Sequence, residues 1–437
     1  MNVSDFKKVQ RVHFIGIGGI GISAIARMFL LEGNPSTGSG RVRVSGSDIA
    51  ESEVTEGLKK AGAAISIGES AQNLPKDADL VIYTIAISKD NTELVEAKKR
   101  GITILTYPEA LGLISKDKYT IAITGTHGKT TTTAMIAKIM IDAGLDPTVI
   151  VGSFLLDTKG GRTNFIAGKG KPAQPDDSGR SGGYLVVEGC EYRRSFLSLH
   201  PKILVITNID ADHLDYYRDL DDIKSAFAEL AAKLLSDGVL INDFASIRLP
   251  EGFRLKIPGV HNLSNAKAAL AVAKVLKITE AKALKSLSEF SGTWRRFEYR
   301  GKTKLGALVY DDYGHHPHEI EATLQGAREL FPTQKIIVVF QPHLYSRTKD
   351  HLAGFGRAFK QADEVILLPI YPAREADPGN INSEMVVAEI KKNSQPAHFT
   401  STFSEAADLA SKLSDKNGII ITMGAGETNK VADMLVR

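Results

Sequence analysis

A glycine turn that carries a lysine and a threonine is the segment of this chain best suited to chemistry. It follows a β-branched, strand-like run, Tyr119–Thr124, and a helix-compatible segment begins just after it. In such a corner the backbone N–H groups face a phosphate, Lys129 reaches the β and γ oxygens, and the Thr130 hydroxyl holds Mg²⁺. The spacing, Gly-x-x-Gly-Lys-Thr, is shorter than the usual pattern, and an ordinary corner with a lysine is the alternative. We predict a nucleoside triphosphate site made by Gly125, Thr126, His127, Gly128, Lys129, Thr130 and Thr131.

A second glycine turn lies near the N-terminus, where Gly16, Gly18, Gly19 and Gly21 follow a strand and open a helix. Glycines at this spacing permit a tight turn and the close approach of a diphosphate to a helix N-terminus. Asp48 ends the next strand, where an acid can bind a ribose. Taken alone, the pattern leaves three alternatives open: NAD, another dinucleotide-like ligand, or close packing of helix on strand.

Two acidic segments follow the phosphate turn. A buried strand ends at Glu188, and the strand at Ile203–Asn208 runs into an Asp-x-Asp-His cluster that includes His213. Carboxylates at the carboxyl ends of parallel strands can reach Mg²⁺ beside a phosphate site, although such acids also cap helices. We predict a magnesium site here, in which His213 is a weaker or second-site ligand because imidazole is an unusual ligand for Mg²⁺.

Later polar segments permit both structural and chemical roles. The Asn residues of His261–Asn265 suit helix N-caps, and the Arg295–Arg296 pair suits either the surface or a phosphate. The Asp311–Pro317 turn lacks the further Cys or His ligands of a structural zinc site. Arg347, which follows a strand, can bind a carboxylate through two hydrogen bonds.

Composition sets limits on the class of protein. Lys and Arg (54) nearly balance Asp and Glu (51), so the charge does not favour a nucleic-acid partner. The single cysteine, Cys190, excludes an internal disulfide and suits a reducing compartment. Because no apolar run approaches the roughly 18 residues of a membrane span, we expect no membrane insertion and a cytoplasmic location.

Strand-like runs alternate with helix-period segments along the whole chain, which predicts an α/β protein with mostly parallel sheets. We expect three domains: 1–115, 116–294 and 295–437. Residues Thr158–Gly183 are rich in Gly, Pro, Ser and Lys without clear periodicity, and we expect a mobile loop inside the second domain.

In their order, the motifs resemble those of the Mur ligase family, the ATP-dependent ligases of peptidoglycan synthesis, over nearly the whole chain. The segment Phe340–Thr348 favours the branch that adds L-alanine to UDP-N-acetylmuramate. The resemblance implies a Rossmann-like N-terminal domain for the UDP-sugar, a central P-loop ATPase-like domain and a Rossmann-like C-terminal domain for the amino acid. The motifs in question are Gly-x-Gly-Gly-x-Gly, Gly-Thr-His-Gly-Lys-Thr, Thr-Asn-Ile-Asp-Ala-Asp-His, His-Asn-x-x-Asn, Arg-Arg-Phe, Asp-Asp-Tyr-Gly-His-His-Pro, Phe-Gln-Pro-His and Tyr-Pro-Ala-Arg-Glu.

The resemblance also implies roles for matching residues. The turn with Gly16, Gly18, Gly19, Gly21 and Asp48 would bind the UDP-sugar and not NAD. The metal would be bound by Thr130, Glu188 and His213. The nucleotide would be bound by the phosphate turn and by His261, Asn262, Asn265, Arg296 and Asp312. The catalytic residues would be Lys129, His315, His343 and Arg347.

The implied reaction uses ATP and Mg²⁺ to convert the lactyl carboxylate of UDP-N-acetylmuramate into an acyl phosphate, which L-alanine attacks. A base must deprotonate the amine, and we expect a histidine of the Asp311–Pro317 turn. Closure about a hinge near Trp294 would exclude water. We expect a monomer or weak homodimer.

The chain departs from the family pattern in the segment after the metal strand. Cys190 and Arg193 replace two acids and Arg194 replaces a glycine; Leu344 stands where many relatives have Arg, and Phe165 and Ile166 alter a Thr-Asn-Ala-Arg pattern. Arg193 or Arg194 would then serve the anionic groups of the UDP-sugar. The alternatives are a recycling ligase that adds a tripeptide, an NAD-dependent oxidoreductase, and a non-catalytic nucleotide-binding protein. The sequence does not separate alanine from serine or glycine as substrate.

Overall fold

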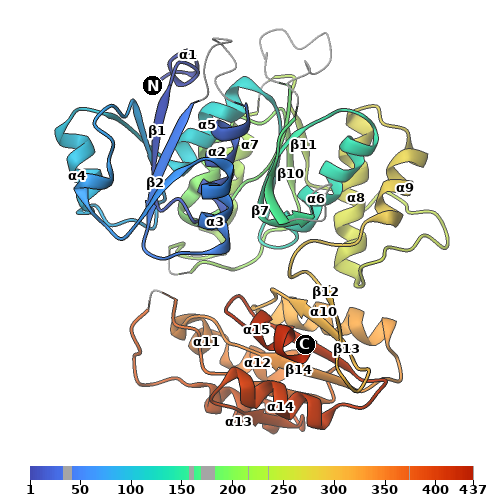
Figure 1. Ribbon diagram of the computed structural model, residues 1–437. Coiled ribbons are helices and arrows are strands. Elements are labelled where there is room, and N and C mark those ends of the chain that lie inside the picture. The colour runs from blue at the N-terminus through green and yellow to red at the C-terminus, as the bar shows by residue number, and fades with distance from the viewer. Residues whose placement is uncertain are drawn as a thin grey trace. The chain divides into compact units, whose positions relative to one another are not determined.

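The computed structural model describes residues 1–32, 42–156, 162–168, 183–214, 216–234, 236–373 and 375–436. It is an α/β structure with three largely parallel sheets, as the alternation of strand and helix patterns predicts (Figure 1). The chain divides into two compact units. The first comprises residues 1–251 and 265–287 and holds two sheets; the second comprises residues 252–264 and 288–437 and holds one.

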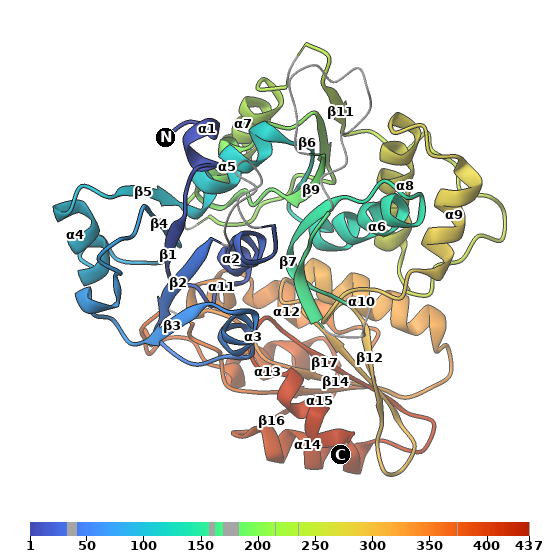
Figure 2. The same cartoon turned by 45° about the horizontal axis from the view of Figure 1, so that its top comes forward.

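The first sheet has five parallel strands in the order β3-β2-β1-β4-β5. Helices α2, α3 and α5 cover one face and α4 the other (Figure 2). The predicted strands at residues 12–17, 42–45 and 80–85 match β1, β2 and β4. The elements are α1 (Val3–Phe6), β1 (Arg11–Ile15), α2 (Ile20–Glu32), β2 (Arg43–Asp48), α3 (Glu53–Ala61), β3 (Ala64–Ile67), η1 (Ala71–Asn73), β4 (Leu80–Tyr83), α4 (Thr92–Lys99), β5 (Thr103–Thr106) and α5 (Tyr107–Asp117).

A polar network lies inside this first sheet. His13 on β1 and Glu93 on α4 are fully buried, and His13 Nε2 lies 2.7 Å from Glu93 Oε2. Ser47 and Asn73 donate further hydrogen bonds to the same carboxylate, at 2.8 and 3.1 Å. Burial alone would raise the pKa of Glu93, but these hydrogen bonds outweigh it and the pKa lies below its ordinary value.

The second sheet has six strands in the order β11-β10-β6-β9-β7-β8, of which only the pair β7–β8 is antiparallel. The expected loop at Thr158–Gly183 is partly wrong, because residues 162–166 form the edge strand β8; residues 157–161 and 169–182 lie outside the described residues. The elements are β6 (Tyr119–Thr124), α6 (Lys129–Asp142), β7 (Thr148–Leu156), β8 (Arg162–Ile166), β9 (Tyr184–Glu188), η2 (Tyr192–Ser198), β10 (Ile203–Ile206), α7 (Leu220–Ala231), β11 (Val239–Ile241), α8 (Val260–Val275) and α9 (Glu280–Glu289).

The third sheet has the order β12-β13-β17-β14-β15-β16, with β12 antiparallel at one edge. Apolar side chains of α10, α12 and α13 form a core on one face, and those of α14 and α15 form a core on the other. The elements are β12 (Glu298–Lys302), β13 (Leu308–Asp312), α10 (Pro317–Leu330), β14 (Ile336–Phe340), α11 (Tyr345–Asp350), α12 (Leu352–Ala358), β15 (Glu364–Leu367), α13 (Ser383–Lys392), β16 (Ala397–Phe399), α14 (Phe403–Leu413), β17 (Ile419–Met423) and α15 (Asn429–Leu435).

Candidate functional site

The predicted phosphate turn connects β6 to α6. Gly125 has φ +132° and Gly128, the N-cap of α6, has φ +81°, which is backbone that favours glycine. Two residues that follow β10 hold the turn. Thr207 Oγ1 donates to the His127 carbonyl at 2.6 Å. The Asn208 carboxamide accepts from the His127 amide and donates to the His127 carbonyl, each at 2.9 Å. Strand β10 therefore ends at Ile206, two residues before the predicted end, because residues 207 and 208 bond the turn instead.

Lys129 is folded onto its own turn. Its ammonium donates to the carbonyls of Gly125 at 2.6 Å and Thr126 at 3.0 Å, and it lies 3.0 Å from the carboxylate of Glu191. Burial lowers the pKa of Lys129, but the Coulomb attraction of Glu191 and the other anionic groups nearby outweighs burial and raises it. Lys129 therefore stays charged, as the predicted role in binding phosphate requires.

Thr130 and Glu188 lie together at this sheet edge. The Thr130 hydroxyl donates to Glu188 Oε2 at 3.2 Å. A side chain at position 152 on β7 would lie 2.6 Å from the same oxygen, so Gly152 leaves the room that the carboxylate occupies. A hydroxyl and a carboxylate beside a phosphate turn are hard oxygen donors, and this set fits Mg²⁺. Among the described residues no group of three or more His, Cys, Asp and Glu is gathered as a metal site, so the remaining ligands would come from substrate and water.

Sequence reasoning missed Glu191 as a site residue. Its side chain is 4% exposed and lies between Lys129 and His213, whose Nε2 is 3.6 Å from Glu191 Oε1. The Tyr217 hydroxyl donates to the Glu191 carbonyl, and the Tyr192 ring packs on His213 with centroids 4.8 Å apart. Glu191 keeps its place in the family pattern, although Cys190, Arg193 and Arg194 around it depart from that pattern. This was the signal in the sequence that could have identified Glu191.

Arg194, one of the departures from the family pattern, pairs with α7. It lies 2.8 Å from Asp222 and 3.2 Å from Glu229, which balances the charge that the substitution brings. Arg193 is exposed and lies over the Tyr192 ring.

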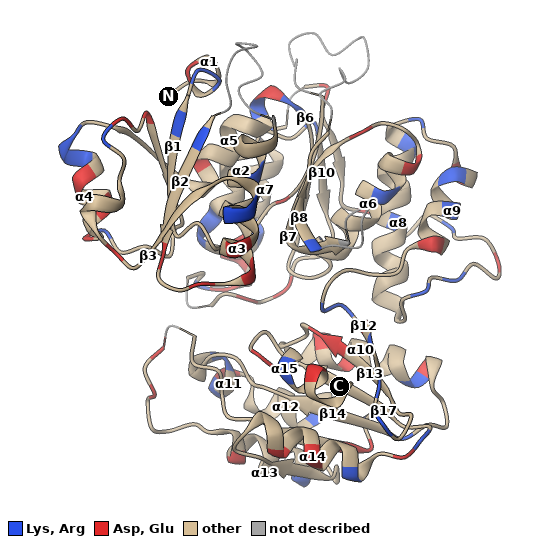
Figure 3. Ribbon diagram, viewed as in Figure 1, with Lys and Arg blue, Asp and Glu red and all other residues tan. Residues whose placement is uncertain are grey.

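Basic and acidic side chains are distributed over both units (Figure 3).

The N-terminal glycine turn lies between β1 and α2. The amides of Gly16 and Ile17 donate to the Ser47 carbonyl, and the Gly18 amide donates to Asp48 Oδ2 at 2.7 Å. Asp48 therefore shapes the turn directly. Gly16 has φ +77°, and a side chain at position 18 would meet the Asp48 carboxylate at 2.8 Å. The turn leaves Gly19 exposed at the start of the helix.

The β7–β8 hairpin packs against α2. Asn164 on β8 is fully buried, and its carboxamide donates to Ser23 Oγ at 2.8 Å and to the carbonyl of Ile20. Because Gly152 on β7 backs Glu188, one hairpin contacts both the predicted metal carboxylate and the first turn of α2. Sequence reasoning assigned Asn164 to a loop and missed this contact.

Three predicted catalytic residues meet at the carboxyl edge of the third sheet. The rings of His315, after β13, and His343, after β14, have centroids 6.0 Å apart, and Arg347 Nη1 lies 3.3 Å from His343 Nδ1. The Tyr371 ring stacks on His343 at 5.6 Å. His315 Nδ1 lies 3.1 Å from the Tyr313 carbonyl, which favours the tautomer with the proton on Nδ1 and the lone pair on Nε2.

The neighbouring arginines have different surroundings. Arg295 is 3% exposed and donates to Asp311 at 2.7 Å, to the carbonyls of Gly424 and Gly426, and to Thr428. Burial raises the pKa of Asp311 to about 6, although Arg295 opposes the shift. Arg296 lies over the Tyr313 ring at 5.3 Å. Arg295 is therefore a structural residue that fixes the glycine turn after β17.

The remaining predicted nucleotide residues are more widely placed. Asp312 accepts from the amides of Phe297 and Gly314, each at 2.8 Å. Asn265 lies beside the phosphate turn, where its Oδ1 would be 2.4 Å from a side chain at Gly128. Asn262 donates to the Pro258 carbonyl in the second unit, and His261 is exposed.

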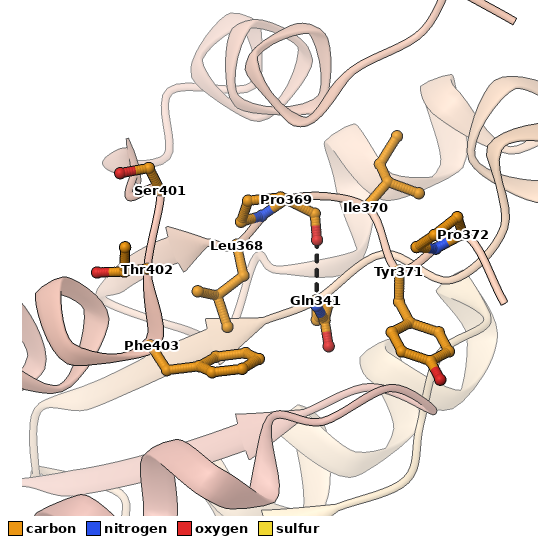
Figure 4. Close-up of a pocket in the computed structure, with 9 residues that line it drawn as sticks. All are labelled: Gln341, Leu368, Pro369, Ile370, Tyr371, Pro372, Ser401, Thr402 and Phe403. Atoms are coloured by element: carbon orange, nitrogen blue, oxygen red, sulfur yellow. Dashed lines mark hydrogen bonds between the residues drawn. The ribbon is translucent and has the colours of Figure 1, made fainter. Parts of the chain in front are cut away.

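A cavity opens at the carboxyl ends of β14 and β15 (Figure 4). Gln341 closes one side, since its carboxamide donates to the Pro369 carbonyl at 3.2 Å and accepts from the Glu427 amide at 2.8 Å. The lining residues are Gln341, Leu368, Pro369, Ile370, Tyr371, Pro372, Ser401, Thr402 and Phe403.

In the described part of the chain, no helix has both the length and the apolar character of a membrane span.

Three family models match the chain in order: "Mur ligase family, catalytic domain" over residues 11–119, "Mur ligase middle domain" over 123–249, and "Mur ligase, glutamate ligase domain" over 295–426. Two relatives named UDP-N-acetylmuramate–L-alanine ligase, from Clostridium kluyveri and Acetivibrio thermocellus, are each 38% identical. The alignments cover 98% and 100% of this chain and 98% of each relative.

Comparison with solved structures agrees with the family models. The UDP-N-acetylmuramate–alanine ligase of Thermotoga maritima matches with a TM-score of 0.79 and 31% identity over 98% of both chains. A murein peptide ligase from Psychrobacter arcticus has the same fold, with a TM-score of 0.70 and 22% identity over 98% of both chains. The predicted α/β class with three domains is confirmed, and the chain belongs to the Mur ligase family.

Proposed function

We propose that this protein is an ADP-forming ligase that joins L-alanine to the lactyl carboxylate of UDP-N-acetylmuramate in cytoplasmic peptidoglycan precursor synthesis. The observation that carries the proposal is the phosphate turn, where a charged Lys129 lies beside the Thr130–Glu188 pair. Full-length relatives of that name support the substrate assignment. An NAD-dependent dehydrogenase is not favoured, because it leaves Lys129 and Glu188 without a role. A non-catalytic nucleotide-binding module would be contradicted by turnover of ATP that depends on UDP-N-acetylmuramate.

A carboxylate is a poor electrophile, so the first step is transfer of the γ-phosphoryl group of ATP to the lactyl carboxylate. Lys129 leaves its turn carbonyls to bind the phosphate oxygens, and the backbone amides of the turn neutralise further charge. Thr130, Glu188 and His213 would hold Mg²⁺, which when bound neutralises charge on the phosphoryl group. Glu191 positions both Lys129 and His213.

The second step is attack of the alanine amine on the acyl phosphate. We assign the base to His315 Nε2, because Nδ1 faces a carbonyl. Arg347 binds the alanine carboxylate and His343 lines the same site. The attack forms the amide bond, releases inorganic phosphate, and passes one amine proton to His315.

The substrates divide among three domains, for which we propose the bounds 1–115, 116–294 and 295–437. The turn at Gly16, Gly18, Gly19 and Gly21, shaped by Asp48, binds the UDP-sugar. The other nucleotide contacts are Asn262, Asn265, Arg296 and Asp312.

Phosphate release tests the proposal. The purified chain is given ATP, Mg²⁺ and UDP-N-acetylmuramate with L-alanine, L-serine, glycine or the tripeptide in separate tubes. We expect the fastest release with L-alanine. Release only with the tripeptide assigns the chain to the recycling branch, and release in none of the tubes from protein that binds ATP contradicts the proposal.

A further inference from the structure

Tyr107 is a half-buried tyrosine that no motif includes. It is the first residue of α5, directly after β5, at the carboxyl edge of the first sheet. Thr106 caps the helix, with a reciprocal hydrogen-bond pair to Glu109, and Pro108 follows. A capping box and a proline in the first turn fix the backbone from which the Tyr107 side chain projects.

One side of the Tyr107 ring faces the N-terminal glycine turn. A side chain built at Gly21 would lie 2.7 Å from Tyr107 Cζ and 2.8 Å from its hydroxyl oxygen. Gly21 is in the first turn of α2, the helix whose N-terminus follows the turn proposed to bind the sugar diphosphate. The phenol therefore occupies the space directly over that turn.

Glu188, which ends β9, and Cys190 also lie near Tyr107. Burial first, and then the nearby Cys190 and Glu188, raise the pKa of Tyr107, so the hydroxyl stays protonated. The same helix packs on η2, where a side chain at Gly112 would meet the Ser198 carbonyl at 2.4 Å. Tyr107 thus lies against the glycine turn and near the proposed metal carboxylate, within one compact unit.

We propose that the Tyr107 hydroxyl donates a hydrogen bond to the lactyl carboxylate of the UDP-sugar and so positions it for phosphorylation. This inference rests on the proposed function. With the diphosphate at the glycine turn and the reacting carboxylate near Glu188, the lactyl group spans the interval where the phenol lies. Within the described chain no protein group hydrogen-bonds this hydroxyl, which leaves a donor for the substrate. A neutral phenol is a strong donor to a carboxylate.

Tyr107→Phe keeps the ring on Gly21 and removes only the hydroxyl. Two ligands are compared by titration calorimetry: UDP-N-acetylmuramate, and UDP-N-acetylglucosamine, which has the same nucleotide and sugar but no lactyl carboxylate. We expect the variant to bind the first about 10-fold more weakly, the factor of one hydrogen bond to a charged group, and the second within about 2-fold of the wild type. Acyl phosphate trapped with hydroxylamine should form at least about 10-fold more slowly.

Tyr184→Phe is the matched control, because Tyr184 begins β9 and so lies at the opposite end of that strand from Glu188. The change should leave both affinities unchanged. Equal weakening for both ligands would contradict the proposal, since it would assign Tyr107 to support of the glycine turn. Unchanged affinity for both would also contradict it. Failure of the proposed function is distinct, because the wild-type chain would then release no phosphate.

Discussion

Gly128→Ala tests whether the phosphate turn depends on the space between its backbone and Asn265. The φ of Gly128 is +81°, a conformation that costs an alanine roughly 1–2 kcal/mol. In addition, the new Cβ would lie 2.4 Å from Asn265 Oδ1, so the carboxamide must move by about 1 Å to reach ordinary contact. Because a displacement of about 1 Å in a positioning group can cost about 100-fold in rate, we expect kcat/KM for ATP to fall about 100-fold.

Gly144→Ala is the matched control at the other end of α6. Its φ is +82°, and a Cβ there meets nothing within 4 Å, so the variant has the same backbone strain without the collision. We expect both variants to lose roughly 1–2 kcal/mol in free energy of unfolding from strain. Gly144→Ala should leave kcat/KM for ATP within about 3-fold of the wild type.

The assay is coupled ADP release at varied ATP, with urea unfolding in parallel. Asn265→Ala removes the atom that collides, so in that background the additional Gly128→Ala change should cost much less than about 100-fold. Equal ATP kinetics for Gly128→Ala and Gly144→Ala would refute the reasoning, as would an undiminished penalty in the Asn265→Ala background.

Lys129→Ala should abolish acyl phosphate formation while calorimetry still detects UDP-N-acetylmuramate binding; near-normal turnover would disprove the assignment of the phosphate turn. Arg295→Lys keeps a charge beside Asp311 but loses hydrogen bonds to buried oxygens, so denaturant unfolding should show a loss of about 3 kcal/mol. Glu93→Gln should destabilise the protein by about 1–3 kcal/mol at pH 7. The native pKa of Glu93 is depressed below 4.5, so its contribution is complete above that pH and is lost as pH falls through the native pKa. Calorimetric scans should therefore show a smaller difference in stability between the wild type and the variant at pH 4 than at pH 7.

The elements around the phosphate turn could be predicted from sequence because local signals agree there. Tyr119–Thr124 is β-branched, Gly125 and Gly128 need positive φ, and Lys129 opens a helix. The meeting of His315, His343 and Arg347 also followed from a general rule, since carboxyl ends of parallel strands share one edge. Their catalytic roles remain predictions.

Other parts of the site had no local signal. The strand β8 lies in a segment with the composition of a loop, and only its antiparallel pairing with β7 makes it a strand. Tyr107 is one of 12 tyrosines, and its position over Gly21 depends on a contact between residues 86 positions apart. Glu191 is a candidate site residue because its carboxylate lies close to Lys129 and His213, which are distant from it in sequence. Such side chains are identified by tertiary packing and not by pattern.

The bond from Asn164 to the first turn of α2 has a consequence for how the first unit folds. Residue 20 begins α2, which covers the first sheet, whereas residue 164 lies on β8 of the second sheet. Helix α2 therefore gains its contacts with β7 and β8 only after both strands have been synthesised. During synthesis we therefore expect α2 to stay incompletely covered until β8, which ends at residue 166, has been made. The contact of α2 with the β7–β8 hairpin thus couples the first two sheets across the boundary between the first two family models, near residue 120.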